Sequence, residues 1–234
     1  FVAALSGHRQ AVIRHFSDVV SDPDEDKNSE ELDSLWVDLW ADLLEQDAAI
    51  SALEGSGHES ADEVLKRLHH LREDPTLKRM QTVGRERLDQ FMPLLLQAVA
   101  KVDNPSTTLL RIFPLVESVL RRTAYLVLLV ENPAGLQQLV SLSAGSSWIA
   151  LHLARHPVLL DELLDSRTLY QVPDKVSLRD EMQQQMLRIP LDDLETHMEA
   201  LRYFKQAHQL RVSAAEVTGK LPLMKVSDYL TNLA

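Results

Sequence analysis

The residue types and spacings that could support chemistry are few, and the first is a pair of histidines. His152 and His156 are four residues apart in a predicted helix, so both imidazoles could bind one metal ion. Residue 153 is leucine, so the glutamate of a His-Glu zinc motif is missing, and no third ligand is evident. His156 also precedes Pro157, where a histidine at a helix end can interact with unpaired carbonyls. We predict a structural role for both histidines and no metal site.

A second candidate is the stretch from Gly55 to Asp62, which reads Gly-Ser-Gly-His-Glu-Ser-Ala-Asp. It is similar to the Gly-Ser turn that opens a nucleotidyltransferase active site. That chemistry needs an Asp-x-Asp pair on one strand, so that both carboxylates face the same magnesium ions. Here Asp62 and Glu63 are adjacent and no strand follows. We predict a flexible loop, then a helix begun by a Ser60–Glu63 capping box, with no catalytic residue.

Basic residues form the third candidate, because they could bind an anion or an acidic partner, although an ordinary cationic surface is the simpler interpretation. They are Lys78, Arg79, Arg85, Arg87, Arg121 and Arg122. Aromatic residues make up only 5% of the chain, which disfavours stacking on nucleic-acid bases.

His69 and His70 are adjacent, point to different faces of one predicted helix, and cannot bind one metal together. The chain has no P-loop, no Gly-x-Gly-x-x-Gly and no Gly-x-Ser-x-Gly.

Composition sets the class of protein. The 234 residues are 45% hydrophobic and 25% charged, which is typical of a globular chain. The absence of cysteine excludes disulfides and thiolate chemistry, and it fits the cytoplasm, where we expect the protein to be. The first residues lack the features of a signal peptide. The longest apolar run, residues 124–130, is far below the ~18–20 residues needed to span a bilayer, so we predict no membrane span.

Charge is distributed unevenly within the net charge of −11. Between Asp18 and Glu63 there are sixteen acidic residues and one basic residue, Lys27, against nineteen acidic and twenty-three basic residues elsewhere. Such an acidic stretch would repel phosphates and argues against nucleic acid as a partner. Residues 21–29 combine Pro23 with a run of carboxylates and predict an acidic linker, whose Asp-x-Asp strings have no scaffold to hold a metal.

Apolar residues recur at helical spacing along most of the chain, with helix caps between them. Residues 114–130 are apolar on most sides and predict a central buried helix. Other predicted helices lie at 1–20, from a Ser29 cap onward, after Ser60, Asp74, Asn104 and Asn132, and at 146–156, 157–164, 177–188 and 192–218. No stretch alternates as a strand does, and nothing repeats at a fixed period. The predicted fold is an all-α multi-helix bundle.

Three longer stretches carry a more specific signal: Leu153–Asp165 (LARHPVLLDELLD), Leu201–Arg211 (LRYFKQAHQLR) and Leu223–Leu233 (LMKVSDYLTNL). Together they resemble the bacterial glutamine synthetase adenylyltransferase family, and the similarity extends to residues 85–93 and to the helix with Trp36 and Trp40. In that family one nucleotidyltransferase domain attaches AMP and another removes it. Both use a Gly-x-Gly-Lys-Leu-Gly-Gly…Ser-Ser-Asp-x-Asp signature that this chain lacks, so the resemblance assigns no catalytic, cofactor-binding or metal residue here.

The resemblance implies a helical interdomain region. Residues 1–20 would be the last helix of the adenylyl-removing half, 21–29 the acidic linker, and 30–234 the helical front end of the transferase half. Because the chain starts at Phe1 and stops within a pattern, we interpret it as part of a larger protein. The implied function is non-catalytic and regulatory, with magnesium and ATP bound elsewhere in the parent. The implied partners are flanking catalytic domains, glutamine synthetase and the PII signal protein. The alternative is a stand-alone helical adaptor that binds a protein partner.

Overall fold

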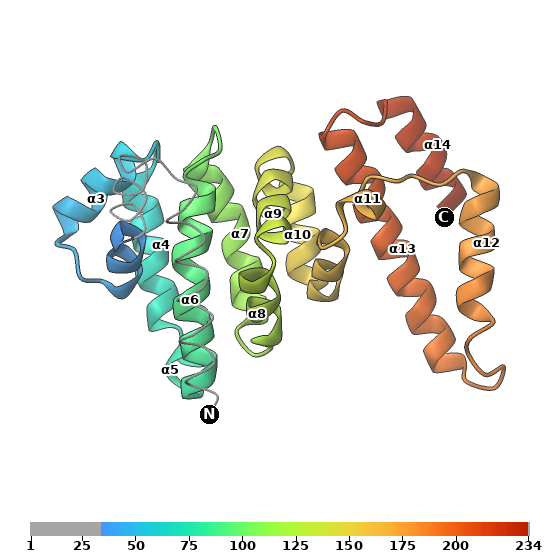
Figure 1. Cartoon of the computed structure of the whole chain (residues 1–234), viewed down its shortest axis with the longest axis horizontal. Helices are drawn as coiled ribbons and strands as arrows, with labels where there is room; N and C mark the ends of the chain where they lie inside the picture. Colours follow the sequence, from blue (N-terminus) through green and yellow to red (C-terminus); the bar gives the residue numbers. More distant parts are fainter. Residues whose placement is uncertain (1–33, 234) are drawn as a thin grey trace, which may run out of the picture.

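The computed structural model describes residues 34–233, which are mostly helical and contain no strand (Figure 1). After a helix over residues 34–41, the elements are α3 (Gln46–Gly55), α4 (Ala61–Glu73), α5 (Pro75–Lys78), α6 (Thr82–Val99), α7 (Pro105–Val119), α8 (Ala124–Glu131), α9 (Pro133–Gly145), α10 (Ser147–Arg155), the 3-10 helix η1 (Pro157–Leu163), α11 (Ser166–Leu169), α12 (Lys175–Met186), α13 (Leu194–Val217) and α14 (Leu223–Leu233). The all-α prediction is confirmed. The predicted helix 1–20, the linker 21–29 and the Ser29 cap lie outside the described residues.

Several predicted helix starts are confirmed. The Asp74 carboxylate accepts the backbone N–H of Thr76 at 2.6 Å, and Pro75 occupies the first position of α5. The Ser146 hydroxyl accepts the N–H of Ile149 at 3.3 Å and begins α10. Asn104 and Asn132 precede α7 and α9, and a proline is the first residue of each helix, as predicted.

The single buried helix predicted for residues 114–130 is wrong. α7 ends at Val119, a turn follows, and α8 begins at Ala124. In a continuous helix Arg122 would follow Val119 on the buried face, three residues further on. The turn instead leaves Arg121 and Arg122 exposed while Leu120 stays buried.

Three smaller predictions about helix starts also need correction. Ser60 precedes α4, but its side chain makes no capping hydrogen bond, so the Ser60–Glu63 capping box does not form. Residues 157–163 form a 3-10 helix, which is the tighter helix that short segments between packed elements often adopt. α12 begins at Lys175, because the Asp174 carboxylate rather than Ser177 caps it and accepts the Ser177 N–H at 2.8 Å.

The helices follow one another along the long axis of the molecule, from α3 and α4 at one end to α12–α14 at the other (Figure 1). A main hydrophobic core runs from the helix over residues 34–41 to α13, and a second core lies among α12, α13 and α14. α13 belongs to both, since Ala207 and Leu210 pack in the main core while Phe204 and Val212 pack in the second. This shared helix joins the two parts.

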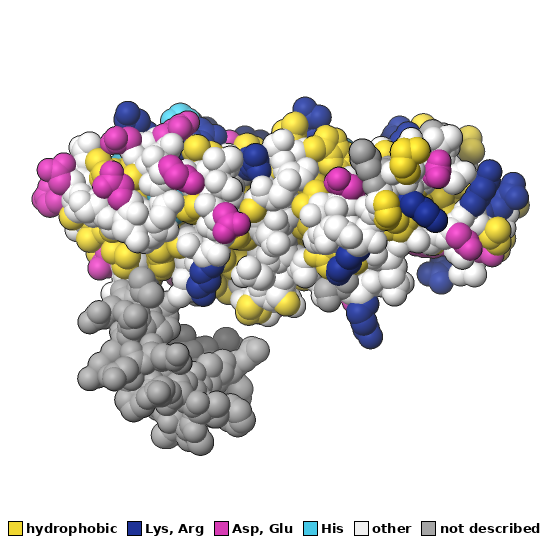
Figure 2. All heavy atoms as spheres, turned by 90° about the horizontal axis from the view of Figure 1, so that it is seen from above, with side chains coloured by type: hydrophobic (Ala, Val, Ile, Leu, Met, Phe, Trp, Pro, Cys, Tyr) yellow, Lys and Arg dark blue, Asp and Glu magenta, His cyan; other side chains and the backbone are white. Residues whose placement is uncertain are grey.

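The surface shows the charge asymmetry seen in the sequence. Residues 34–63 contain eight acidic residues and no lysine or arginine. Figure 2 shows carboxylates gathered at the end of the molecule formed by the first described helices, and basic side chains at the opposite end. Within residues 34–233, no helix is both long and apolar enough to cross a membrane.

Candidate functional site

The Gly55–Asp62 stretch is a tight connection between α3 and α4. Gly57 has a φ of +86°, a left-handed conformation that glycine adopts readily. The backbone N–H of Ser60 donates to the Ser106 hydroxyl on α7 at 3.1 Å, so the connection is anchored to a neighbouring helix. Asp62 lies with Glu63 in the first turn of α4, and both side chains are exposed. The structure therefore does not bring two carboxylates together on a strand here.

His58, within the same connection, is buried in the protein interior. Its Nδ1 lies 3.3 Å from the Ser106 hydroxyl, and its Nε2 has no hydrogen-bond partner within residues 34–233. Burial lowers the pKa of His58, and the nearby Glu59 carboxylate opposes this only in part. A neutral imidazole at this position holds the connection against α7.

His152 and His156 lie near each other, but protein groups already occupy them. The His152 ring stacks on Trp148 with ring centroids 4.6 Å apart, and its Nε2 lies 3.2 Å from the Gln206 carbonyl oxygen on α13. That contact requires a proton on Nε2, which leaves this nitrogen without a lone pair for a metal. The His156 Nε2 lies 3.4 Å from the Gln206 side-chain nitrogen. The pair links α10 to α13.

The other candidate site residues from the sequence are the adjacent histidines and the basic residues, which lie at or near the surface. His69 and His70 are exposed, and the Nδ1 of His69 lies 3.7 Å from the Asp42 carboxylate. Arg85 forms an ion pair with Asp89 at 3.1 Å. The other basic candidates divide between a cavity lined by Arg79, Arg87 and Arg121 and two exposed positions outside it, Lys78 and Arg122.

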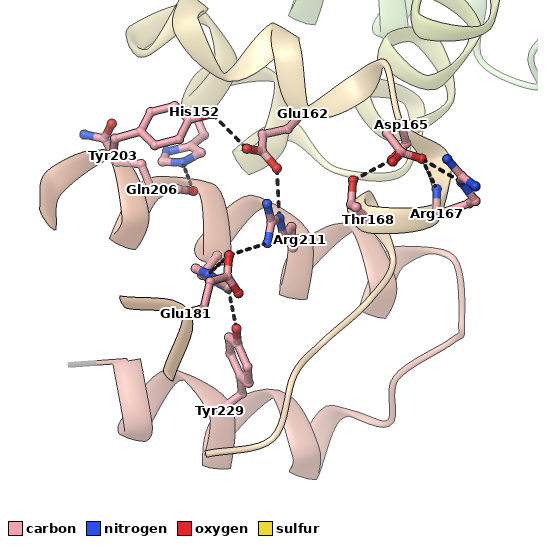
Figure 3. A network of polar contacts seen from close by, with 11 residues as sticks. His152, Glu162, Asp165, Arg167, Thr168, Glu181, Tyr203, Gln206, Arg211 and Tyr229 are labelled. Carbon is pink, nitrogen blue, oxygen red and sulfur yellow. Dashed lines mark hydrogen bonds and ion pairs between the residues drawn. The ribbon is translucent and has the colours of Figure 1, made fainter. Parts of the chain in front are cut away.

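The most extensive polar site was not predicted as a site, and it centres on Glu162 of η1 (Figure 3). The hydroxyl of Tyr203 donates to Glu162 Oε1 at 2.8 Å, and the Nε of Arg211 donates to Oε2 at 2.8 Å. Both donors lie on α13, so one carboxylate is bound by two side chains of the shared helix.

The network continues from Arg211 into the second core. Its Nη1 donates to Glu181 Oε1 on α12 at 3.3 Å, and the same oxygen lies 3.5 Å from the Nε2 of His208. The Nδ1 of His208 is 2.5 Å from the Tyr229 hydroxyl on α14. Polar contacts thus connect η1, α13, α12 and α14, and Figure 3 shows these side chains converging on α13.

Burial and the two carboxylates set the protonation of this network. Burial works against the charge of Arg211, but Glu162 and Glu181 together outweigh it and raise the arginine pKa. Burial and the Glu162 carboxylate raise the pKa of Tyr203, which therefore remains a neutral donor. Burial lowers the pKa of His208, although Glu181 favours its charged form. Each group thus has a fixed partner, as in a structural network.

The residues of this network lie in the sequence stretches that carried the family resemblance, but the sequence did not show that they contact one another. Glu162 lies in the first of the stretches that carried the resemblance, Tyr203 and Arg211 lie in the second, and Tyr229 lies in the third. The tertiary structure brings the three stretches into contact through this network.

Within residues 34–233, no group of three or more His, Cys, Asp or Glu side chains is arranged to hold a metal ion. The absence of a catalytic, cofactor-binding or metal residue remains a prediction.

Comparison with known proteins gives a match over the part of the chain that contains the three specific stretches. The family model described as glutamate-ammonia ligase adenylyltransferase matches residues 136–234, which include η1, α13 and α14. A bifunctional glutamine synthetase adenylyltransferase/adenylyl-removing enzyme of Pseudomonas putida is 50% identical over 222 residues, covering 94% of this chain and 23% of the relative. The proteins of the same name from Pseudomonas aeruginosa and Hahella chejuensis are 47% and 50% identical over 238 and 231 residues.

These two matches cover 100% and 98% of this chain and 24% of each relative. The chain therefore spans about a quarter of the length of the curated relatives it matches. The resemblance found in the sequence is confirmed, and the chain belongs to the glutamate-ammonia ligase adenylyltransferase family.

Proposed function

We propose that this chain is a non-catalytic helical segment between two catalytic domains of an enzyme that attaches AMP to glutamine synthetase and removes it. The names of its relatives support the activity of the parent, and the all-α fold supports the placement. The catalytic domains would bind magnesium and ATP. The parent would act in the cytoplasm on glutamine synthetase, under control of the PII signal protein, with no nucleic acid as a partner.

The observation that carries the proposal is that α13 packs in both hydrophobic cores. This helix has 24 residues and is about 36 Å long at 1.5 Å per residue. It packs in the main core and in the second core, and Arg211 joins it to Glu162 and Glu181 on either side. Because packed helices move as rigid bodies, a displacement at one end of such a unit is transmitted to the other.

Exposed leucines at the turn between α12 and α13 support a contact with another domain. Leu187, Leu191 and Leu194 are 85%, 94% and 73% exposed. Large apolar side chains grouped on a surface are typical of interaction sites. In the parent we expect this turn to pack against a flanking domain.

The first experiment tests whether the chain is catalytic. Purified chain is assayed with ATP, magnesium and unmodified glutamine synthetase, and then with the adenylylated form plus phosphate. We expect no turnover in either direction, because phosphoryl transfer of this type needs magnesium held on paired carboxylates. Turnover that is lost in Asp62→Ala/Glu63→Ala would identify the Gly55–Asp62 stretch as a site, and turnover that survives would indicate another one.

The second experiment tests coupling in the longer parent protein. Arg211→Met removes the cation between Glu162 and Glu181, whereas Arg202→Met removes an exposed charge from the same helix. We expect Arg211→Met to change how the PII signal protein shifts the balance between AMP addition and removal. Arg202→Met should respond as the unaltered parent does. Equal responses in all three proteins would contradict the coupling role.

A further inference from the structure

A cavity of about 610 Å³ lies between α5, the first half of α6 and the turn that joins α7 to α8. Three arginines line it from three separate segments: Arg79 follows α5, Arg87 lies on α6 and Arg121 lies in the turn. No aspartate or glutamate is among its lining residues. The volume falls within the range of small-molecule sites, which is roughly 300–1,000 Å³.

The shape of the cavity depends on the same turn that interrupts the predicted helix. That turn brings Arg121 and Thr123 to the cavity wall. Gly84 allows α6 to approach closely, because a Cβ there would lie 2.8 Å from Met80 Cγ and 3.2 Å from Thr123 Cγ2. The Nη1 of Arg87 donates to the Thr123 hydroxyl at 3.1 Å, which holds this guanidinium against the wall.

The charge of the cavity is not compensated within residues 34–233. Arg85, on the same helix as Arg87, pairs with Asp89, and Arg67 pairs with Glu117. No such carboxylate pairs with the three arginines of the cavity in this part of the chain. Three positive charges in a concave site raise the local potential and attract an anion.

The donors favour a phosphoryl group over other anions. Guanidinium groups bind phosphate through two parallel N–H donors, and the hydroxyls of Thr76 and Thr123 add neutral donors in the same cavity. An amino acid is disfavoured, since no carboxylate is present to bind its ammonium group. Met80, Val83 and Leu120 supply apolar wall for an organic part of the ligand.

We propose that this cavity binds a phosphorylated small molecule, with its phosphoryl group among Arg79, Arg87 and Arg121 and its organic part against Met80, Val83 and Leu120. The assignment rests on the cavity alone and is independent of the function proposed above. An acidic polypeptide is a poorer fit, because the neighbouring cations Lys78 and Arg122 lie outside the lining and do not extend the site.

The test is titration calorimetry on the 234-residue chain at fixed ionic strength, with inorganic phosphate, AMP and adenosine as probes. We expect AMP to bind more tightly than phosphate and adenosine not to bind. Arg121→Gln should weaken AMP binding about tenfold or more, as expected for the loss of a charge-assisted hydrogen bond. Arg79→Gln should have a similar effect. Both side chains are exposed, so both variants should fold, as circular dichroism will check.

Matched controls come from adjacent residues. Arg122→Gln and Lys78→Gln make the same change of charge one position away, outside the cavity, and should leave AMP binding within about twofold of the unaltered chain. Equal weakening within either pair would mean a diffuse cationic surface and would overturn the proposal. It would also be overturned if AMP did not bind or if adenosine bound as tightly as AMP.

Discussion

The Arg211 guanidinium and the Glu162 carboxylate lie 49 residues apart in the sequence and are joined by a hydrogen bond of 2.8 Å from Nε to Oε2. Their side chains are only 18% and 9% exposed. Both charged groups are largely removed from water, so the loss of either one would leave the other buried without its partner. This pair connects α13 to η1, and the further contact of Arg211 with Glu181 connects both to α12.

Arg211→Met should lower the free energy of unfolding by about 3 kcal/mol, because it leaves the Glu162 charge largely buried without its cation. The measurement is urea unfolding followed by circular dichroism. Arg202→Met, on an exposed position of the same helix, should change the value by less than about 0.5 kcal/mol. A loss for Arg211→Met no larger than that of the control would show that the pair does not stabilise the fold.

Gly145→Ala should destabilise the chain by about 1–2 kcal/mol through steric conflict between α9 and α13. A Cβ at this position would overlap with Cγ1 of Val217, and a valine in a helix has little freedom to rotate away. Val217→Ala removes the conflicting methyl groups. In that background the penalty of Gly145→Ala should disappear, and a double-mutant cycle of unfolding free energies measures the coupling. Additive effects would contradict close contact at this position.

The stability of the fold should decrease as the pH falls from 7 to 5. Burial lowers the pKa of His58, His152 and His208 in the folded chain, so below pH ~6.5 the unfolded chain binds more protons than the folded one. Unfolding free energy therefore rises with pH across this window. His58→Gln should reduce the slope, and His70→Gln, at an exposed position, is the control. Equal slopes in both variants would exclude His58 as a contributor.

Zinc should not raise the melting temperature of the chain. A ligand that binds only the folded state stabilises it by about 2.7 kcal/mol at a hundred times its dissociation constant, which calorimetry would detect. The Nε2 of His152 already donates to the Gln206 carbonyl oxygen, so this nitrogen is not available to bind a metal ion together with His156. A reproducible rise that His152→Ala abolishes would overturn this interpretation.

The sequence by itself determined the class of fold and most helix starts. Caps such as Asp74 and Ser146 act within three residues of the backbone groups they bind, and apolar residues repeat with the helical period. It also determined the family, because similarity between two sequences can be recognised without knowing how the chain folds. These are local or directly readable properties, which is why they could be predicted.

Only the tertiary structure decided where the apolar stretch 114–130 breaks and what the three specific stretches do. An apolar run has no polar face to mark its end. The turn after Val119 leaves Arg121 and Arg122 exposed while apolar side chains of both flanking helices pack in the core. The Glu162–Arg211 pair joins segments whose distance depends on the packing of every helix between them. Side-chain chemistry indicates which groups can pair, but the fold determines which of them come within hydrogen-bonding distance.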